Sequence, residues 1–445
     1  MEELLQKIRS NKHWNLSLLI VFSATLLLIS YRLEQSDFIY LIALIAPAFL
    51  IYLIACKSSF WTMWLYLGIA LRFLMIFAFP NLSDDIYRFI WDGHLLNLGY
   101  DPFEQVPSYY IQNQLEPMVL TNALFEQLNS PDYFSVYPPF AQLIFKLGSS
   151  ISAGDIYTFS MVLKAFILAA ETCTIFLLIK LLKHWDLRKE RILLYSLNPL
   201  IIIELGGNMH FEAFMICFFV AAIYLLSKQR IVLAAMLMSG SIAAKLLTLI
   251  PQVFILKRMR LKDLLIYGTA LFIFLCIFFL PVFNLEFIKN FGCSLDLYFR
   301  NFEFNASIYF LINGIVKMVK GYGLIAIVGP ALSLITLLTI VGLALKNREK
   351  DLLSLMQMSF WAFCIYLFLG TTIHPWYLAL PIMLSIFTNY RFIHLWSFLA
   401  FLSYSKYSIY EDSYYPLVTL EYLLVYGMLF YELYKLFIAR RLQIK

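Results

Sequence analysis

Charged side chains are scarce in this sequence. Of its 445 residues only 14% are Asp, Glu, Lys or Arg, and 62% are hydrophobic. Ordinary soluble domains carry about 25% charged residues, so a soluble globular domain is excluded. Apolar runs of about 18 or more residues recur along most of the chain, long enough to span a bilayer as helices, and they lack the alternation of a transmembrane β-barrel. We therefore predict an all-α, polytopic helical membrane protein.

Cysteine is also sparse, and its spacing carries no motif. Five of the six cysteines lie in or at the ends of apolar runs, and only Cys293 falls in an expected loop. This pattern excludes a disulfide framework and a cysteine-based metal site. The net charge of +6 comes from basic residues in short loops, so no nucleic-acid partner is expected. Neither an internal repeat nor a low-complexity linker divides the chain, and we expect residues 1–445 to form one membrane domain.

The basic loops predict the topology. By the positive-inside rule the N-terminus, the strongly basic loop 180–191 and the C-terminus are expected in the cytoplasm. The first apolar run has no small-residue cleavage site and is expected to remain as a helix. Residues 231–256 lie between two basic clusters and must form two short helices, with Lys245 near their outer turn. The total is 14 spans, or 12 if this pair is a re-entrant hairpin.

The longest polar segment covers residues 80–156 and is expected outside the membrane. It carries nine acidic residues but only two basic ones, Arg88 and Lys146. We expect interfacial helices at 115–128 and from about residue 140. The segment is therefore a loop with helices on the outer surface and not a separate domain.

Two adjacent carboxylates, Asp84 and Asp85, open this segment directly after an apolar run. On a helix capped near Ser83, Asp84 shares one face with Arg88 and Asp92, which follow at i+4 and i+8. We expect the opposite charge of Arg88 to keep Asp84 ionised. The alternative is a capped interfacial helix whose charges serve only as its own ion-pair ladder.

Further polar side chains are expected at the same ends of the spans. A mixture of carboxylates and cations suits transfer from a phosphate-bearing donor to a hydroxyl group. One carboxylate accepts the proton of the attacking hydroxyl, while Lys or Arg binds the departing phosphate. An energised nucleotide sugar is not expected outside the cell, so a lipid phosphate is the expected donor.

Several segments resemble one family when they are taken in order. They are Asp84 to Gly93, Gly99 to Phe103, Tyr137-Pro138-Pro139, Asn198-Pro199, Gly207 to Glu212, the Lys245 segment and His374 to Tyr377. Together they resemble bacterial mannosyltransferase-type members of the GT-C class of integral-membrane glycosyltransferases. The chain departs from many GT-C enzymes in having two spans, and not one, before the carboxylate loop.

The resemblance implies an inverting transferase that uses a polyprenyl-phosphate sugar, often mannose, with an Asp as general base. The acceptor would be a glycan or a lipid, and the enzyme would lie in a bacterial inner membrane with its active site outside. We assign catalysis to Asp84, with Asp85 second. The residues expected to contact substrate are Tyr87, Arg88, Asp92, Tyr137, Asn208, His210, Glu212, Lys245, Arg300 and His374. Among these, Lys245 is expected at the donor phosphate.

Each assignment has a plainer alternative. The turn 208–212 joins two spans and needs no function, Lys245 can snorkel to the interface, and Tyr137 and His374 precede prolines that fit a rigid turn and a helix start. No cofactor is expected, although His210 and Glu212 with the acid pair leave a divalent metal as an alternative. For the whole chain the alternative is a transporter or lipid flippase. The carboxylate-rich loop, the lack of repeats and the scarcity of charge inside the spans disfavour it.

Overall fold

The computed structural model describes residues 2–113 and 120–443, and its regular elements within them are helices. Seven of these helices are long and apolar enough to cross a membrane, judged by length and composition. They are α2 (Lys12–Arg32), α3 (Phe38–Ala55), α9 (Ile156–His184), α14 (Leu261–Phe279) with its extension η4 (Leu280–Val282), α17 (Ile325–Lys346), α18 (Leu352–Leu369) and α21 (Tyr414–Gln443). The predicted fold class is confirmed.

Other apolar helices are broken or short. The helix η2 (Ile201–Gly207) bends by 108° against α11 (Glu212–Ser227), so that the pair counts as one broken span or a re-entrant loop. Shorter apolar helices are α4 (Trp61–Met75), α12 (Ile231–Ala244), η3 (Leu246–Leu249) with α13 (Gln252–Leu256), and η5 (Pro375–Leu378) with α19 (Ala379–Ser385). The expected helix break at Lys245 is present. The count of 12 to 14 spans, which includes these shorter helices, stays a prediction.

The remaining helices connect and cover the bundle. They are α1 (Glu2–Ser10), α5 (Asp85–Asn97), α6 (Pro107–Gln112), α7 (Asn122–Phe125), α8 (Pro139–Ser152), η1 (Lys189–Ile192), α10 (Leu193–Ser196), α15 (Leu285–Arg300), α16 (Ile308–Lys320), α20 (Phe392–Leu399), η6 (Ala400–Tyr407) and η7 (Glu411–Ser413). The helix expected from about residue 140 is α8. The helix expected over 115–128 is wrong in its described part, because only the four residues of α7 are helical there. Residues 115–119 lie outside the described residues.

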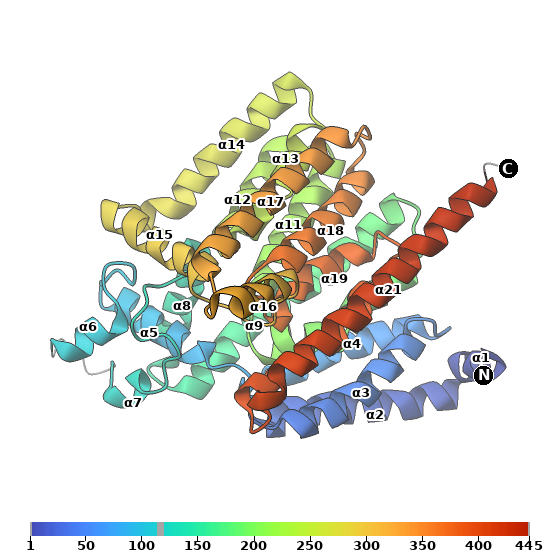
Figure 1. Ribbon diagram of the computed structural model, residues 1–445, viewed down its shortest axis with the longest axis horizontal. Coiled ribbons are helices and arrows are strands. Elements are labelled where there is room, and N and C mark those ends of the chain that lie inside the picture. Colours follow the sequence, from blue (N-terminus) through green and yellow to red (C-terminus); the bar gives the residue numbers. More distant parts are fainter. Residues whose placement is uncertain (1, 114–119, 444–445) are drawn as a thin grey trace.

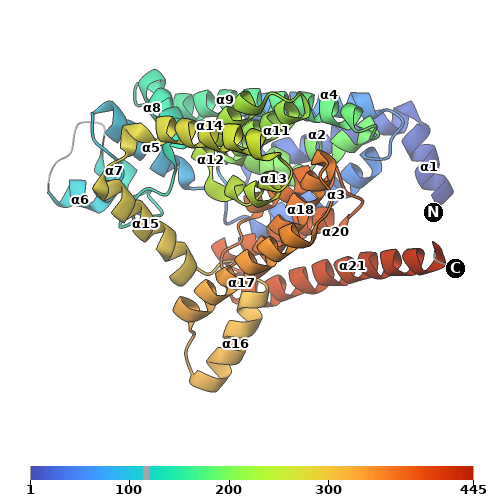
Figure 2. The same cartoon turned by 90° about the horizontal axis from the view of Figure 1, so that it is seen from above.

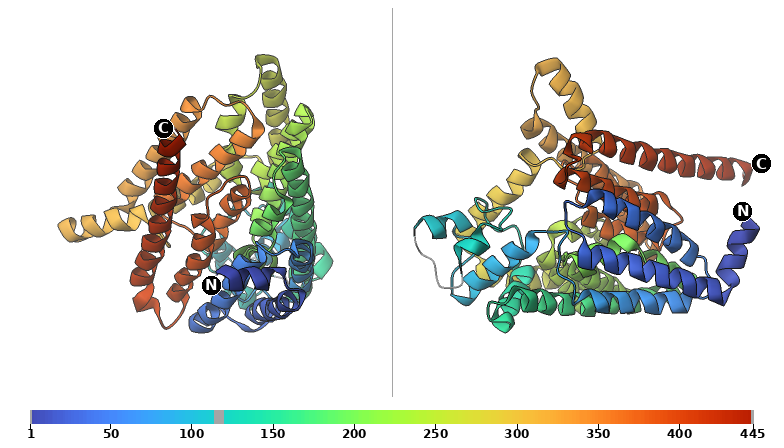
Figure 3. Two further views of the ribbon diagram at one scale, coloured as in Figure 1. Left: turned by 90° about the vertical axis from the view of Figure 1, so that its right-hand side faces the viewer. Right: turned by 90° about the horizontal axis from the view of Figure 1, so that it is seen from below.

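The helices are arranged so that the carboxylate segment and the chain ends are far apart. Helices α5 to α8 gather at one end of the molecule, and α1 and the last turns of α21 lie at the other (Figure 1). Helix α16 projects from the body of the molecule in the view from above (Figure 2). Helix α21 runs along one side (Figure 3). One hydrophobic core joins the bundle, from Phe22 in α2 to Leu429 in α21.

A glycine sets the distance between α5 and α8. A Cβ atom added to Gly93 would lie 2.5 Å from the carbonyl oxygen of Phe145 and 3.0 Å from the Cβ of Ser149. Because no side chain fits between the two backbones, α5 packs directly on α8. This contact holds the helix that begins with the acid pair.

Candidate active site

The acid pair lies at the N-terminus of α5. Asp84 is the residue before the helix, yet its side chain makes no capping hydrogen bond and stays exposed. Asp85 is partly buried, and its Oδ1 accepts a hydrogen bond of 3.1 Å from Asn129 Nδ2. The protein packed around Asp84 and the neighbouring charge of Asp85 raise the pKa of the Asp84 carboxyl group. The two carboxylates therefore differ: Asp85 is held by Asn129, whereas Asp84 is exposed and makes no capping hydrogen bond.

An unusual turn brings His210 to this pair. Helix η2 is a π-helix, and Asn208 N donates to Ile203 O at 2.8 Å across its wider turn. Met209 then takes a left-handed conformation with φ of 63°, which a side chain other than glycine adopts only at a cost. His210 Nδ1 consequently lies 3.9 Å from Asp85 Oδ2, and its Nε2 lies 3.2 Å from Glu204 Oε2.

Glu204 holds the far side of His210. Its side chain is fully buried, and it accepts hydrogen bonds from Asn208 Nδ2 at 3.0 Å and from the Tyr404 hydroxyl at 2.8 Å. The Nε2 of His210 is close to Glu204 but is not aligned for a hydrogen bond. His210 thus lies between a buried carboxylate and the partly exposed Asp85.

A column of stacked rings supports the imidazole. His210 stacks on Trp376 at 3.7 Å between ring centres, Trp376 on His374 at 4.4 Å, and His374 on Phe304 at 4.7 Å. Tyr407 follows Phe304 at 5.7 Å. Burial, the charge of His210 and the charge of Lys245 lower the pKa of His374 to about 3. His374 is therefore neutral at physiological pH and acts as a flat ring inside the column.

Lys245 reaches the same region from the break between α12 and η3. Its backbone is extended there, with φ of −161° and ψ of 130°. The ammonium group forms an ion pair with the buried Glu212 and lies 4.6 Å from the centre of the Tyr377 ring. Tyr377, which contacts the Lys245 ammonium group, is the next residue after Trp376, which stacks on His210. The segment 374–377 therefore contacts both Lys245 and His210. About a quarter of the Lys245 side chain, 28%, remains exposed.

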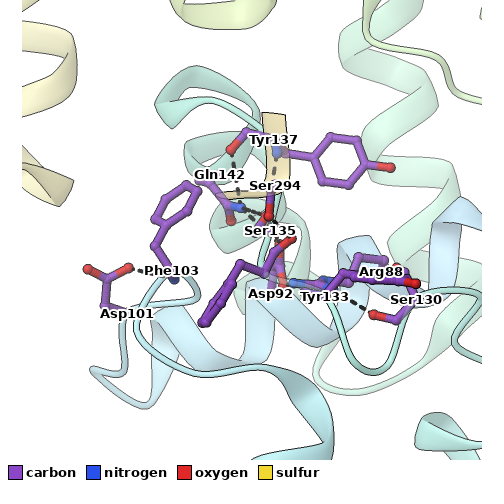
Figure 4. A network of polar contacts seen from close by, with 11 residues as sticks. Arg88, Asp92, Asp101, Phe103, Ser130, Tyr133, Ser135, Tyr137, Gln142 and Ser294 are labelled. Carbon is purple, nitrogen blue, oxygen red and sulfur yellow. Dashed lines mark hydrogen bonds and ion pairs between the residues drawn. The ribbon is translucent and has the colours of Figure 1, made fainter. Parts of the chain in front are cut away.

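Arg88 and Asp92 form a separate network (Figure 4). The buried Asp92 carboxylate accepts hydrogen bonds from Arg88 Nε at 2.8 Å, Ser135 Oγ at 2.6 Å and Gln142 Nε2 at 2.9 Å. Arg88 Nη1 donates to the carbonyl oxygens of Ser130 and Tyr133. The expected pairing of Arg88 with Asp84 is therefore wrong. Arg88 is directed down the helix because the loop carbonyls and Asp92 offer buried partners, and Asp84 lies outside at the helix start.

The other expected residues are dispersed. Tyr87 is partly buried on the first turn of α5. The Tyr137 ring packs edge-on against Phe89 and Phe145 at 4.9 and 5.4 Å. Arg300 is exposed and pairs with Asp296 on its own helix at 2.7 Å. No described contact brings Arg300 to the acid pair, and the substrate roles of all three stay predictions.

Some members of the site were not expected from the sequence. Glu204, Trp376 and Tyr404 surround His210, and none of them had been assigned a substrate contact. Glu204 belonged to the polar groups expected at the outer ends of the spans, Trp376 lay in the His374 to Tyr377 segment, and no sequence signal indicated Tyr404. Among the described residues no group of three His, Cys, Asp or Glu side chains is arranged to hold a metal ion. The expectation of no cofactor stays a prediction.

Buried charges also occur deep in the bundle, which the scarcity of charge had not suggested. Arg72 of α4 and Glu171 of α9 form a buried ion pair of 3.0 Å, and Tyr195 donates to the same Glu171. Lys164 of α9 donates to the carbonyl oxygens of Met75 and Ala78 at the end of α4. Arg72 and Glu171 neutralise each other, and backbone carbonyl groups accept the hydrogen bonds of Lys164. They anchor α4, the helix that leads into the acid pair.

Comparison with known proteins finds similarity over the part of the chain that holds this site. The sequence model described as alpha-(1->6)-mannopyranosyltransferase, N-terminal domain, matches residues 39–259, which include the acid pair, the His210 turn and Lys245. Alpha-(1->6)-mannopyranosyltransferase A of Corynebacterium glutamicum is 25% identical over 175 residues. That match covers 38% of this chain and only about a third, 34%, of the relative's length. The resemblance of this chain to bacterial mannosyltransferases of the GT-C type is thus confirmed.

Proposed function

We propose that this protein transfers a sugar, mannose in the first instance, from a polyprenyl-phosphate donor to a hydroxyl group of a glycan or lipid acceptor. The observation that carries this proposal is the meeting of the acid pair with His210 at one end of the spans, while Lys245 reaches the same ring column. The mannose specificity rests on the similarity to the alpha-(1->6)-mannopyranosyltransferase family and to the relative of the same name.

Asp84 is proposed as the general base. Its carboxylate is exposed and has no capping hydrogen bond, and its raised pKa makes it a better proton acceptor near neutral pH than an ordinary aspartate. Asp85 is tied to Asn129 and close to His210. Its role is to orient the acceptor hydroxyl and to maintain the charge around the base.

The transfer step balances on these groups. The acceptor oxygen attacks the anomeric carbon of the sugar and forms the new glycosidic bond, while its proton passes to Asp84. The bond between the anomeric carbon and the phosphate oxygen breaks, and polyprenyl phosphate leaves with the electron pair. Attack from the face opposite the leaving group inverts the anomeric configuration.

Lys245 is proposed to bind the donor phosphate. Its ammonium group has three donors, and its side chain is partly exposed although it pairs with Glu212. A phosphate next to it gains a charge-assisted hydrogen bond, and the negative charge that develops on the leaving group is stabilised. The external position of the site remains part of the proposal, because it is the reason for expecting a lipid phosphate and not a nucleotide sugar as donor.

The test uses purified protein and a panel of polyprenyl-phosphate sugars, with released polyprenyl phosphate as the readout. We expect release with the mannose donor and a loss on the order of 10²–10⁴ in rate for Asp84→Asn, since a general base contributes that much. Asp132→Asn is the matched control, because Asp132 is an exposed acid of the same loop. No release from any donor, or full activity in both Asp84→Asn and Asp85→Asn, would contradict the proposal.

One observation favours transport as a second candidate. The 108° bend between η2 and α11 resembles the discontinuous helices that bind substrates in transporters. In this chain the bend places His210 between two carboxylates beside the proposed base, as the transfer reaction needs. Movement of an intact lipid-linked sugar across vesicles, without release of polyprenyl phosphate, would favour the transporter.

A further inference from the structure

A groove of about 760 Å³ lies at the end of the bundle away from the acid pair. Its walls come from four segments: residues 187–191 before and within η1, residues 357–361 of α18, the loop 387–391 and residues 428–436 of α21.

Helix α21 connects the groove with the ring column. Tyr414 on α21 has its ring 5.8 Å from Phe304 of the ring column, and Glu432 on the same helix lies in the groove. Their 18-residue separation corresponds to roughly 27 Å along the helix, close to the thickness of the hydrocarbon core of a bilayer.

The polar part of the groove carries an excess of positive charge. Arg191, Arg391 and Lys435 line it together with one carboxylate, Glu432. Glu432 is occupied by backbone groups, since it accepts hydrogen bonds from Arg391 N at 2.9 Å and Phe392 N at 3.3 Å. Within the described residues no ion pair joins it to any of the three cations.

Each cation is placed differently. Arg191 donates to the carbonyl oxygens of Ile386 and Thr388 at 3.0 Å, and it fixes the loop without any carboxylate partner. Arg391 is exposed. Lys435 is exposed and lies over the Tyr431 ring at 4.5 Å. The groove therefore presents two accessible cations backed by a third that is partly buried.

The other wall of the groove is apolar. Met358 and Trp361 of α18 face Met428, Tyr431 and Leu436 of α21 across it. The groove thus has a cationic rim, aromatic and thioether side chains along its length, and a position near one end of the spans. This distribution of charged and apolar groups matches that of a lipid with an anionic head group. Basic pockets between transmembrane helices bind such head groups.

We infer that this groove binds an anionic phospholipid, with the phosphate at Arg391 and Lys435 and an acyl chain between α18 and α21. The inference concerns a site that the transfer reaction does not use, and it stands independently of the proposed function. A bound lipid would fill the groove and tie α21 to α18 and to the 387–391 loop.

The test measures lipid selectivity at Trp361. The protein is reconstituted in phosphatidylcholine vesicles containing either brominated phosphatidylglycerol or brominated phosphatidylcholine, and quenching of tryptophan fluorescence is followed. Subtraction of the Trp361→Phe signal isolates the tryptophan of the groove from the other seven. We expect stronger quenching by the anionic lipid at equal mole fraction.

Charge variants decide the outcome. Arg391→Ala with Lys435→Ala should lower the preference for the anionic lipid about 25-fold, at about fivefold per charge, whereas Arg391→Lys should keep most of it. Arg348→Ala with Lys350→Ala, two exposed cations before α18 that do not line the groove, is the matched control. Equal selectivity in the wild type and the groove variant, an equal loss in the control, or loss of selectivity in millimolar inorganic phosphate at constant ionic strength would overturn the inference.

Discussion

Adjacent aspartates in this protein have different environments. Asp85 is bonded to Asn129 and close to His210, whereas Asp84 remains exposed with a raised pKa. Two like charges side by side disfavour each other's ionised form. The chemistry proposed for Asp84 therefore depends on the charge of Asp85, which makes the pair testable by pH.

Asp85→Asn should move the acid limb of the pH profile of kcat/KM to lower pH. The proposed base must be ionised to act, and removal of the neighbouring charge lowers the pKa of Asp84. Desolvation, the larger cause of the raised pKa, would remain, so the shift should be partial. The measurement is transfer rate between pH 4 and 8. An acid limb that stays in place, or that moves to higher pH, would remove Asp84 from the role of base.

Lys245→Ala should raise the KM for the lipid donor more than it lowers kcat, because it removes a contact made to the donor before the chemical step. Lys245→Arg should restore part of the affinity, since it keeps the charge and changes the geometry. The alanine variant also leaves Glu212 buried without its cation, so thermal unfolding is measured alongside. If the KM for the donor is unchanged in a folded alanine variant, Lys245 does not bind the donor phosphate and only snorkels to the membrane interface.

His374 predicts a pH dependence of stability. Its pKa is about 3 in the folded protein and near 6.5 when unfolded, so stability is complete above pH 6.5 and falls as the pH drops toward 3. At pH 5 the loss from this group should reach about 2 kcal/mol. His374→Phe keeps a flat ring in the column without a titrating group, and its melting temperature should fall less between pH 7 and 5. Equal falls in both proteins would show that His374 is not the cause.

At the scale of elements, the position of the site depends on close packing of short helices. Helix α5 carries the acid pair, and α8 contacts its backbone at Gly93. Lys164 of α9 holds the carbonyl end of α4, a few residues before Asp84. The acid pair is thus held by contacts of the segments before and after it in the sequence, and these contacts involve no substrate.

Gly93→Ala should destabilise the protein by about 1–3 kcal/mol, the usual cost of forcing an extra methyl group into a packed contact. It should also reduce transfer, because α5 must move away from α8 and carries Asp85 with it. Gly292→Ala is the matched control: Gly292 is an exposed helix residue whose added Cβ would meet nothing within 4 Å. Thermal unfolding and transfer rate are compared for the two. A fully stable and active Gly93→Ala would contradict the packing argument.

At the scale of the whole molecule, the acid pair and the basic loops lie at opposite ends. The α5 to α8 segment is far from α1 and from the last turns of α21 (Figure 1). The groove with Arg191 and Lys435 belongs to the second end. This separation matches a protein whose two ends face different sides of a membrane.

Single cysteines at Asn113 and at Lys189, in a background without the native cysteines, should react with a membrane-impermeant reagent from opposite sides. Both positions are exposed, Asn113 beside α6 and Lys189 in η1. We expect Asn113 to react from the outside, since the positive-inside rule puts Lys189 in the cytoplasm. Reaction of both from one side would overturn the topology and, with it, the lipid-phosphate donor.

The sequence by itself determined the helical membrane fold, the carboxylate pair after α4 and the break at Lys245. Each depends on local composition: long apolar runs have one stable form in a bilayer, and 26 residues between two basic clusters leave room only for short helices. Tertiary structure alone decided the partner of Arg88, the ring column and the contact of Glu204 with His210. Those contacts join segments as distant as His210, Phe304 and Tyr407, or depend on a π-helix, and no local periodicity encodes them.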